Sequence, residues 1–208
     1  MTTTIYIKRH SEPFNKLKGE RNTTDSSQLL NEKQILSVDG ERLASDTSNI
    51  KELKHIDVLY ASSYVRTQQT AKYICENNQI VMNIDDRLGE RRYSTNANIT
   101  PAFYDKEWEE RDYVDGDGES INMTAYRMNV VITEIINNNK NKTICIVGHA
   151  TAIFAYFSLI SKVYRDGLNF VIEYNNEEIF RDEVYPNVLF KLVFDDNNNL
   201  IEFKNIRY

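Results

Sequence analysis

Four residues whose side chains could bind or attack a phosphoryl group lie at or just after three apolar runs of this chain. Arg9 and His10 follow the run at residues 5–7, and His149 follows "CIVG". Arg66 lies shortly after "VLYA", at the start of a stretch with a helical pattern. An arginine fork binds oxyanions bidentately and stays charged, and a neutral imidazole can act as a nucleophile. Together these residue types predict a site that binds a phosphoryl group and could take it up on a histidine.

A carboxyl group is also needed, because a leaving alkoxide must receive a proton. Glu90, in the segment "LGERRYS", is the best candidate for this general acid and for the later base that activates water. It would have to be protonated when the substrate binds. An ion pair with Arg91 or Arg92 would explain Glu90 without any catalytic role, although Arg91 is also the cation best placed to contact the rest of a substrate. Other carboxylates available for the acid role are Glu12, Asp85, Asp86 and Glu119.

Strands that alternate with helices are the elements that would position these residues. Strands are expected at 4–8, 56–62, 80–88 and 142–150, and helices at 31–47, 64–78, 124–139 and 151–161. Two further strands, joined by a polar turn, are expected at 187–208, and they are antiparallel if the turn is short. This alternation predicts an α/β fold, a three-layer α/β/α sandwich with a mostly parallel sheet. Ligands of such sheets bind beyond the carboxyl ends of the strands, so the two arginines and two histidines should converge there.

The start of the first expected helix has a capping pattern. Asn31 is placed to cap the helix, and Gln34 stands three residues later, as in a capping box. Ile35, Val38 and Leu43 recur at roughly helical spacing. For the helix at 64–78, Ser62 or Ser63 is the expected cap.

Composition limits the function classes. The chain has 208 residues, a net charge of −6 and a hydrophobic fraction of 41%. We therefore expect one domain over residues 1–208, with a cap-like excursion at about 91–120, and no nucleic-acid or membrane partner. Cys75 and Cys145 are expected to be buried thiols in the cytoplasm, and the absence of a Cys/His cluster predicts a protein without metal or cofactor. The oligomeric state stays open.

Several segments, in order, resemble the histidine phosphatase superfamily, the phosphoglycerate mutase-like proteins. The segment "RHSE" resembles the signature R-H-G-[EQ], "LNEKQILSVDGERLA" resembles L-T-E-x-G-x-x-Q-A, and "ASSYVRTQQTA" resembles S-x-x-x-R-x-x-[QH]-T-A. The segments "LGERRYS", "GES" and "VGHA" also match, and "GHA" is similar to the mutase-type branch. The resemblance runs from residue 4 to about residue 155.

The resemblance implies a metal-independent α/β sandwich and assigns roles. His10 is the phosphorylated nucleophile, Arg9, Arg66 and His149 form the phosphate pocket, and Glu90 is the proton donor. The chain departs from the family pattern at Ser11, where glycine is usual. The phosphate-binding asparagine that usually lies six residues after the nucleophile is represented by Asn15, five residues after His10.

The resulting hypothesis is a phosphomonoesterase that acts through a phosphohistidine on a small phosphorylated metabolite. A cofactor-dependent phosphoglycerate mutase is an alternative, because "GERRYS" resembles the Glu-Arg segment of that subgroup. A second alternative is a binding module for phosphorylated ligands that has lost turnover. The sequence does not identify the substrate.

Overall fold

A six-stranded mixed sheet forms the centre of the computed structural model, which describes residues 2–14, 26–95 and 100–208. Its strand order is β3-β2-β4-β1-β8-β9. The bounds are β1 (Thr3–Arg9), β2 (Val58–Ala61), β3 (Met82–Ile84), β4 (Thr143–Gly148), β8 (Leu189–Phe194) and β9 (Leu200–Ile206). The first four strands are parallel, whereas β8 runs antiparallel to both β1 and β9. The predicted α/β fold with a mostly parallel sheet is confirmed, as is the antiparallel C-terminal pair.

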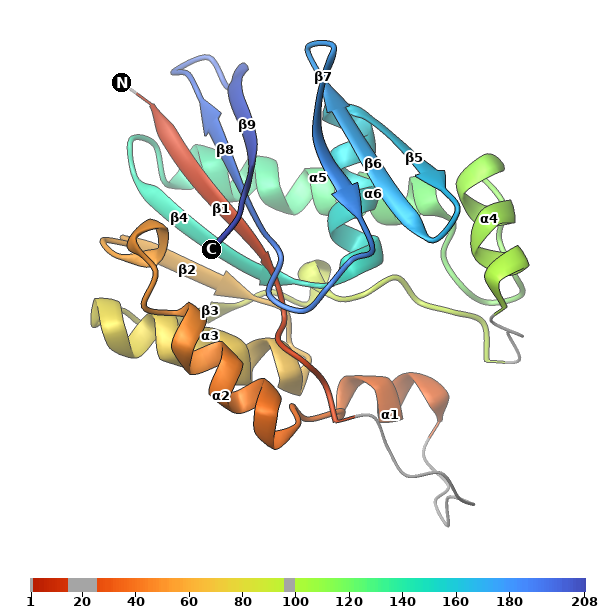
Figure 1. Ribbon diagram of the computed structural model, residues 1–208, viewed down its shortest axis with the longest axis horizontal. Coiled ribbons are helices and arrows are strands. Elements are labelled where there is room, and N and C mark those ends of the chain that lie inside the picture. Colours follow the sequence, from red (N-terminus) through yellow and green to blue (C-terminus); the bar gives the residue numbers. More distant parts are fainter. Residues whose placement is uncertain (1, 15–25, 96–99) are drawn as a thin grey trace.

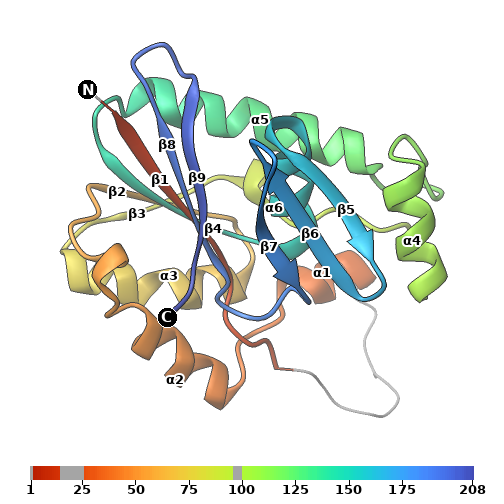
Figure 2. The same cartoon turned by 45° about the horizontal axis from the view of Figure 1, so that its top comes forward.

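Helices cover both faces of this sheet (Figures 1 and 2). Their bounds are α1 (Ser27–Glu32), α2 (Val38–Thr47), α3 (Val65–Asn78), α4 (Pro101–Glu109), α5 (Ile121–Asn138) and α6 (Ala150–Ile160), with single 3₁₀ turns at Lys51–Leu53 and Asp86–Leu88. Helices α2 and α3 lie on one face, and α5 and α6 lie on the other. No helix within the described ranges is long and apolar enough to cross a bilayer.

Alternate side chains of the central strands supply the two cores. Ile144 and Ile146 pack into the core that contains α5 and α6, whereas Cys145 and Val147 pack into the core that contains Ile74 of α3. This is the pattern of a strand buried on both faces, because successive side chains point to opposite sides. Both cysteines, Cys75 and Cys145, are buried and unpaired.

The expected helix at 31–47 is wrong: the region contains two helices with an extended segment between them. Helix α2 begins at Val38, and its cap is Ser37, whose Oγ accepts the Gly40 N–H at 2.8 Å. Asn31 lies inside α1 and caps neither helix. Ile35 and Val38 are 49% and 78% exposed, so they do not form a buried stripe.

Pairing with the segment after β1 explains this break. Leu36 forms a β-bridge with Pro13, the Phe14 N–H donates to the Ile35 carbonyl, and the Ser37 N–H donates to the carbonyl of residue 12. These contacts hold residues 35–37 extended. Tertiary pairing thus overrides a local helical pattern, as it commonly does for a weak propensity signal.

A second sheet was not anticipated from the sequence. It has three antiparallel strands, β5 (Lys162–Asp166), β6 (Asn169–Tyr174) and β7 (Glu177–Asp182). Phe154 of α6 packs against Phe170 and Phe180 with ring centroids 4.7 and 5.6 Å away, so this sheet closes the core over α6.

The stretch at 91–120 contains α4, which lies against β5. The Trp108 ring packs on Phe170 at 4.9 Å. The excursion therefore contacts the second sheet. That residues 1–208 form one domain with this segment as a cap stays a prediction.

Candidate active site

Three adjacent parallel strands, β2, β4 and β1, place the predicted residues at one edge of the sheet. His10 directly follows β1, and His149 directly follows β4. The His10 N–H donates to the Gly148 carbonyl at 3.0 Å, and the His10 and His149 ring centroids are 5.3 Å apart. Arg66, in the first turn of α3, contacts both rings. The structure thus brings together three of the residues that the sequence placed at strand tips.

The hydrogen bonds assign the tautomers of the two imidazoles. His10 Nδ1 lies 2.6 Å from the Ser11 carbonyl oxygen, which can only accept, so Nδ1 carries the proton. Arg66 Nε then donates to His10 Nε2 at 3.1 Å. By the same reasoning Arg66 Nη2 donates to His149 Nδ1 at 3.1 Å, and His149 Nε2–H donates to Ser62 Oγ at 2.7 Å. Each histidine therefore presents one lone pair toward the guanidinium of Arg66.

Both histidines are neutral at physiological pH. Burial lowers the pKa of His10 well below its ordinary value, and the charges of Arg66 and Arg9 lower it further. Burial also lowers the pKa of His149, again with help from Arg66. A neutral imidazole keeps the lone pair that nucleophilic attack requires.

Arg9 lies at the tip of β1 and is anchored to the loop that precedes β8. Its backbone N–H donates to the Val188 carbonyl at 3.0 Å, and its Nη1 donates to the Val184 carbonyl. Its Nε is buried and has no hydrogen-bond partner in the described part of the chain. Burial lowers the pKa of Arg9, and the negative charge of Glu90 raises it. The two charged groups therefore interact electrostatically.

The Glu90 carboxylate lies at the N-terminus of α6, next to His149. Its Oε1 accepts the N–H groups of Arg91 and Ala152, both at 2.9 Å, and its Oε2 accepts the Thr151 N–H at 3.3 Å. A helix N-terminus favours a carboxylate through its free N–H groups and its dipole. These backbone donors fix the carboxyl group in one orientation, and the side chain is partly exposed.

The ion pairs that would have explained Glu90 without catalysis do not form. Arg91 pairs with Glu107 of α4, and Arg92 pairs with Glu119. The Arg91 side chain is only 1% exposed, and its Nε donates to the Glu119 carbonyl at 2.6 Å. The expectation that Arg91 contacts the substrate is therefore wrong, because its charge is used to hold α4.

Two of the other candidate acids are paired with arginines. Asp85 accepts two hydrogen bonds from Arg87, at 3.0 and 2.7 Å, which lower its pKa. Burial alone would raise the pKa of Glu119, but hydrogen bonds and charge from Arg127 outweigh it and lower the pKa. Glu12 and Asp86 are exposed. Asn15, expected to bind phosphate, lies outside the described residues.

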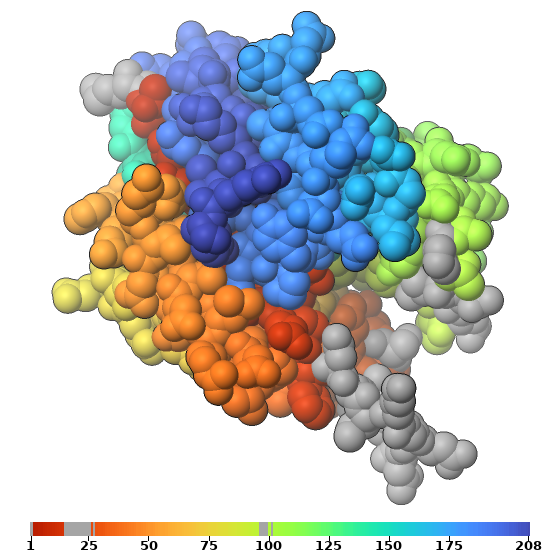
Figure 3. All heavy atoms as spheres, in the orientation of Figure 1, coloured from red at the N-terminus to blue at the C-terminus, as the bar shows by residue number. Residues whose placement is uncertain are grey.

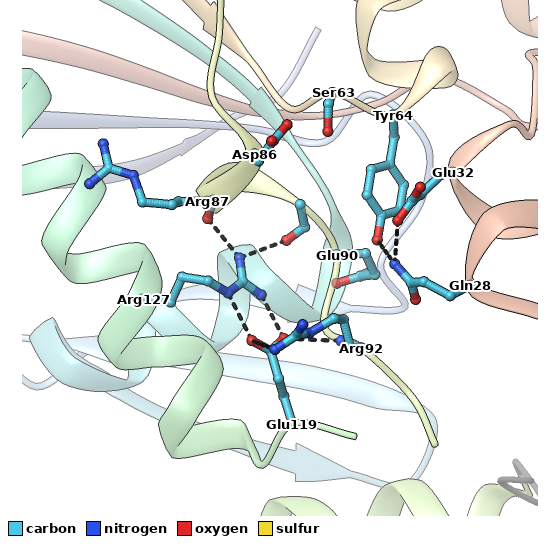
Figure 4. Close-up of a pocket in the computed structure, with 11 residues that line it drawn as sticks. Gln28, Glu32, Ser63, Tyr64, Asp86, Arg87, Glu90, Arg92, Glu119 and Arg127 are labelled. Atoms are coloured by element: carbon cyan, nitrogen blue, oxygen red, sulfur yellow. Dashed lines mark hydrogen bonds and ion pairs between the residues drawn. The ribbon is translucent and has the colours of Figure 1, made fainter. Parts of the chain in front are cut away.

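A cavity of about 490 Å³ opens beside Glu90 (Figure 4). Gln28, Tyr64, Glu90, Arg92, Glu119 and Arg127 are among the residues that line it. Figure 4 shows the Glu119–Arg127 pair on one side and the Tyr64–Gln28 hydrogen bond on the other. Glu90 faces the space between them, so a leaving group held in the cavity would lie near its carboxyl group.

Tyr64 and the role of Ser62 were missed in the sequence. The Tyr64 ring packs on His149 with centroids 4.6 Å apart, and the Arg66 guanidinium lies 5.0 Å from the Tyr64 ring centre. Ser62 does not cap α3, which has no side-chain cap; instead its Oγ accepts from His149. Their position in the sequence could have indicated a role in the site, because both residues lie between the end of β2 and Arg66.

No group of three or more His, Cys, Asp or Glu side chains in the described ranges is arranged to hold a metal ion. The positive charges around His10 and His149 are supplied by Arg9 and Arg66. The fold and these strand-tip residues define a phosphoglycerate mutase-like α/β protein.

Comparisons with known proteins identify the family. A model of the histidine phosphatase superfamily, branch 1, matches residues 5–179, so the chain belongs to this superfamily. No curated protein matches the sequence. The predicted family is confirmed, and together with the fold it supports a phosphatase.

Solved structures with the same fold share little sequence with this chain. A mycobacterial glucosyl-3-phosphoglycerate phosphatase has a TM-score of 0.69 at 16% identity, and the match covers 100% of this chain and 99% of that one. YhfR from Bacillus stearothermophilus has a TM-score of 0.69 at 19% identity, covering 96% and 94% of the two chains. Phosphoserine phosphatase from Entamoeba histolytica, solved with 3-phosphoglyceric acid, has a TM-score of 0.66 at 20% identity, covering 99% and 98%.

Proposed function

We propose that this protein is a metal-independent phosphomonoesterase that acts through a phosphohistidine on a small phosphorylated metabolite. The observation that carries the proposal is the position of Arg66 between two buried, neutral imidazoles. A phosphate dianion would take over the guanidinium hydrogen bonds, because arginine binds phosphate oxygens bidentately. This exchange would release the His10 Nε2 lone pair toward phosphorus.

The reaction then has two steps. In the first, a bond forms between His10 Nε2 and phosphorus, the ester P–O bond breaks, and Glu90 in its acid form gives its proton to the leaving oxygen. In the second, water attacks the phosphorus while the Glu90 carboxylate takes its proton. The N–P bond breaks, and inorganic phosphate and free His10 result. Arg9, Arg66 and His149 stabilise the charge on the phosphoryl oxygens in both steps.

The substrate class is proposed from the cavity and from the neighbours. Two structural neighbours are named as phosphatases of glucosyl-3-phosphoglycerate and of phosphoserine. The cavity of about 490 Å³ beside Glu90 is of a size that suits a small metabolite. A cytoplasmic location, in keeping with the unpaired Cys75 and Cys145, belongs to the same proposal.

The mutase alternative was favoured by the segment "GERRYS". Of its two arginines, Arg91 is buried in the ion pair with Glu107, whereas Arg92 lines the cavity. A coupled assay with 2,3-bisphosphoglycerate tests this alternative: isomerisation of phosphoglycerate faster than phosphate release would favour the mutase. The alternative of a binding module without turnover is tested by the experiment below.

The test is phosphate release from p-nitrophenyl phosphate in the presence of EDTA. The wild type should release phosphate, and His10→Ala should lose about 10³-fold or more of kcat. During turnover of a ³²P-labelled substrate, the protein should carry an acid-labile, base-stable label that His10→Ala lacks. His55→Ala, at the exposed third histidine, is the matched control and should keep full activity. Activity that survives in His10→Ala would show that the scheme is wrong.

A further inference from the structure

Ser11, the residue directly after His10, is fully buried and uses every polar atom it has. Its N–H donates to Thr70 Oγ1 at 2.9 Å, and its carbonyl accepts from His10 Nδ1 at 2.6 Å. Its hydroxyl donates to the Gly40 carbonyl at 2.7 Å and accepts from Asn187 Nδ2 at 2.8 Å. The carbonyl that orients the His10 ring therefore belongs to a residue whose backbone and side chain are both fixed by hydrogen bonds.

Asn187 approaches this residue from the loop between β7 and β8. It is 2% exposed, and its φ of +64° lies in the left-handed region, which asparagine tolerates better than most residues. Its backbone N–H donates to the His10 carbonyl at 3.3 Å, and its own carbonyl accepts from Lys8 Nζ at 3.4 Å and from the Tyr208 hydroxyl at 2.5 Å. Asn187 thus contacts the backbone of His10 and the side chain of Ser11 at once.

Gly40 allows a third segment, the first turn of α2, to come close to the chain that follows His10. A Cβ at Gly40 would lie 2.1 Å from the carbonyl oxygen of Glu12, so only glycine permits this approach. The chain after His10 therefore packs directly on the first turn of α2, within reach of the Ser11 hydroxyl. Figure 3 shows red atoms of the N-terminal segment lying between the orange segment and the blue C-terminal segment.

We infer that Ser11 and Asn187 form a clamp that sets the orientation and tautomer of His10. The clamp consists of the Asn187–Ser11 side-chain hydrogen bond, the Ser11–Gly40 hydrogen bond and the Asn187–His10 backbone hydrogen bond. The proposal rests on the proposed role of His10 as nucleophile. Both are positioning residues, since they act through His10.

The physical reason lies in the backbone after the nucleophile. The direction of the Ser11 carbonyl depends on the φ and ψ angles of Ser11, and that carbonyl holds the proton on His10 Nδ1. Glycine, usual at this position in the resembled signature, leaves these angles freer. The buried serine hydroxyl replaces that freedom with two hydrogen bonds, and Asn187 supplies one of them.

The experiment compares Ser11→Gly, Asn187→Gly and the double variant. Glycine at 187 accepts the left-handed φ, so this change removes only the side chain. Each single variant should lose about tenfold to 100-fold in kcat, the scale of a misplaced catalytic group, with KM unchanged. The ¹⁵N spectrum of the imidazole nitrogens should change in parallel, from one His10 tautomer to an exchanging pair. The double variant should be no worse than the poorer single variant, because the two residues act as one unit.

Ile132→Val, a change in the core on the buried face of α5, is the matched control for lost stability. It should lower the melting temperature without changing kcat or the tautomer. Wild-type kcat and tautomer in both glycine variants would overturn the clamp. Losses that multiply in the double variant would also overturn it, as would a kcat loss in Ile132→Val equal to that of the clamp variants.

The clamp and the proposed function fail in different ways. If the wild type releases no phosphate, the function is wrong, while the ¹⁵N spectra still decide whether Ser11 and Asn187 set the tautomer. If phosphate release and the phosphohistidine label are present but the spectra of the variants match the wild type, only the clamp is wrong.

Discussion

At the scale of single residues, the surroundings of the Glu90 side chain matter most, because they determine whether it can act as the general acid. It sits at the N-terminus of α6, held by three backbone N–H groups, and faces the cavity that would hold the leaving group. Arginines next to it in sequence are occupied elsewhere. A carboxyl group so oriented, with no ion pair to a lysine or arginine in the described part of the chain, is suited to proton transfer.

The first prediction concerns this proton. Glu90→Gln should lower kcat/KM for an alkyl phosphate such as glycerol phosphate by about 10²–10⁴-fold, the range for a general acid. For p-nitrophenyl phosphate the loss in kcat/KM should be much smaller, since p-nitrophenolate leaves without a proton. Initial rates over a range of substrate concentrations give both values.

Asp86→Asn is the control, because Asp86 is exposed and lines the same cavity. It should leave both kcat/KM values unchanged. Equal losses for the two substrates in Glu90→Gln would contradict the role of Glu90 as acid.

At the scale of elements, the Arg91–Glu107 pair joins the segment of Glu90 to α4. The two side chains are 1% and 0% exposed, and the Arg91 guanidinium also lies 4.9 Å from the centre of the Tyr93 ring. Burial raises the pKa of Glu107, although the charge of Arg91 opposes it. Such a pair is costly to break on one side only, because the remaining charge stays buried.

The second prediction follows from this burial. Arg91→Met and Glu107→Leu should each lower the free energy of unfolding by about 3–5 kcal/mol, and the double variant should lose less than the sum. Urea denaturation measures all three. Lys162→Met, which breaks the exposed Lys162–Glu173 pair, should cost less than about 1 kcal/mol. Strictly additive losses in the double variant would show that the pair is not coupled.

At the scale of the whole molecule, the two active-site histidines make stability depend on pH. Their pKa values are lowered in the folded protein, whereas unfolded histidines titrate near 6.5. Below about pH 6.5 the unfolded chain therefore binds protons that the folded chain does not. Stability should fall as pH decreases through this range. Lys8, whose pKa burial lowers to about 7, is protonated in both states below pH 6 and adds little there.

The third prediction concerns the slope of the free energy of unfolding against pH. Between pH 6.5 and 5 the free energy of unfolding should fall by up to about 1.4 kcal/mol per pH unit for each of the two histidines. His149→Gln should remove the contribution of one histidine. Urea denaturation at several pH values provides the comparison. A wild-type curve no steeper than that of His149→Gln would contradict the prediction.

The sequence by itself determined the layered α/β fold and the convergence of His10, Arg66 and His149. It could do so because apolar runs mark buried strands, and parallel strands bring their carboxyl ends to one edge. The family was likewise visible in short motifs that lie in order. The roles of these residues, and of Asn15, stay predictions.

Only the tertiary structure decided what each side chain pairs with. The contacts of Asn187 with Ser11, of Glu107 with Arg91 and of Tyr64 with His149 join segments that no local pattern relates. The break at residues 33–37 has the same origin, because pairing with Pro13 outweighs the helical pattern. Local propensity is worth tenths of a kcal/mol per residue, whereas buried hydrogen bonds and ion pairs between distant segments are worth more, so the latter set the details of the site.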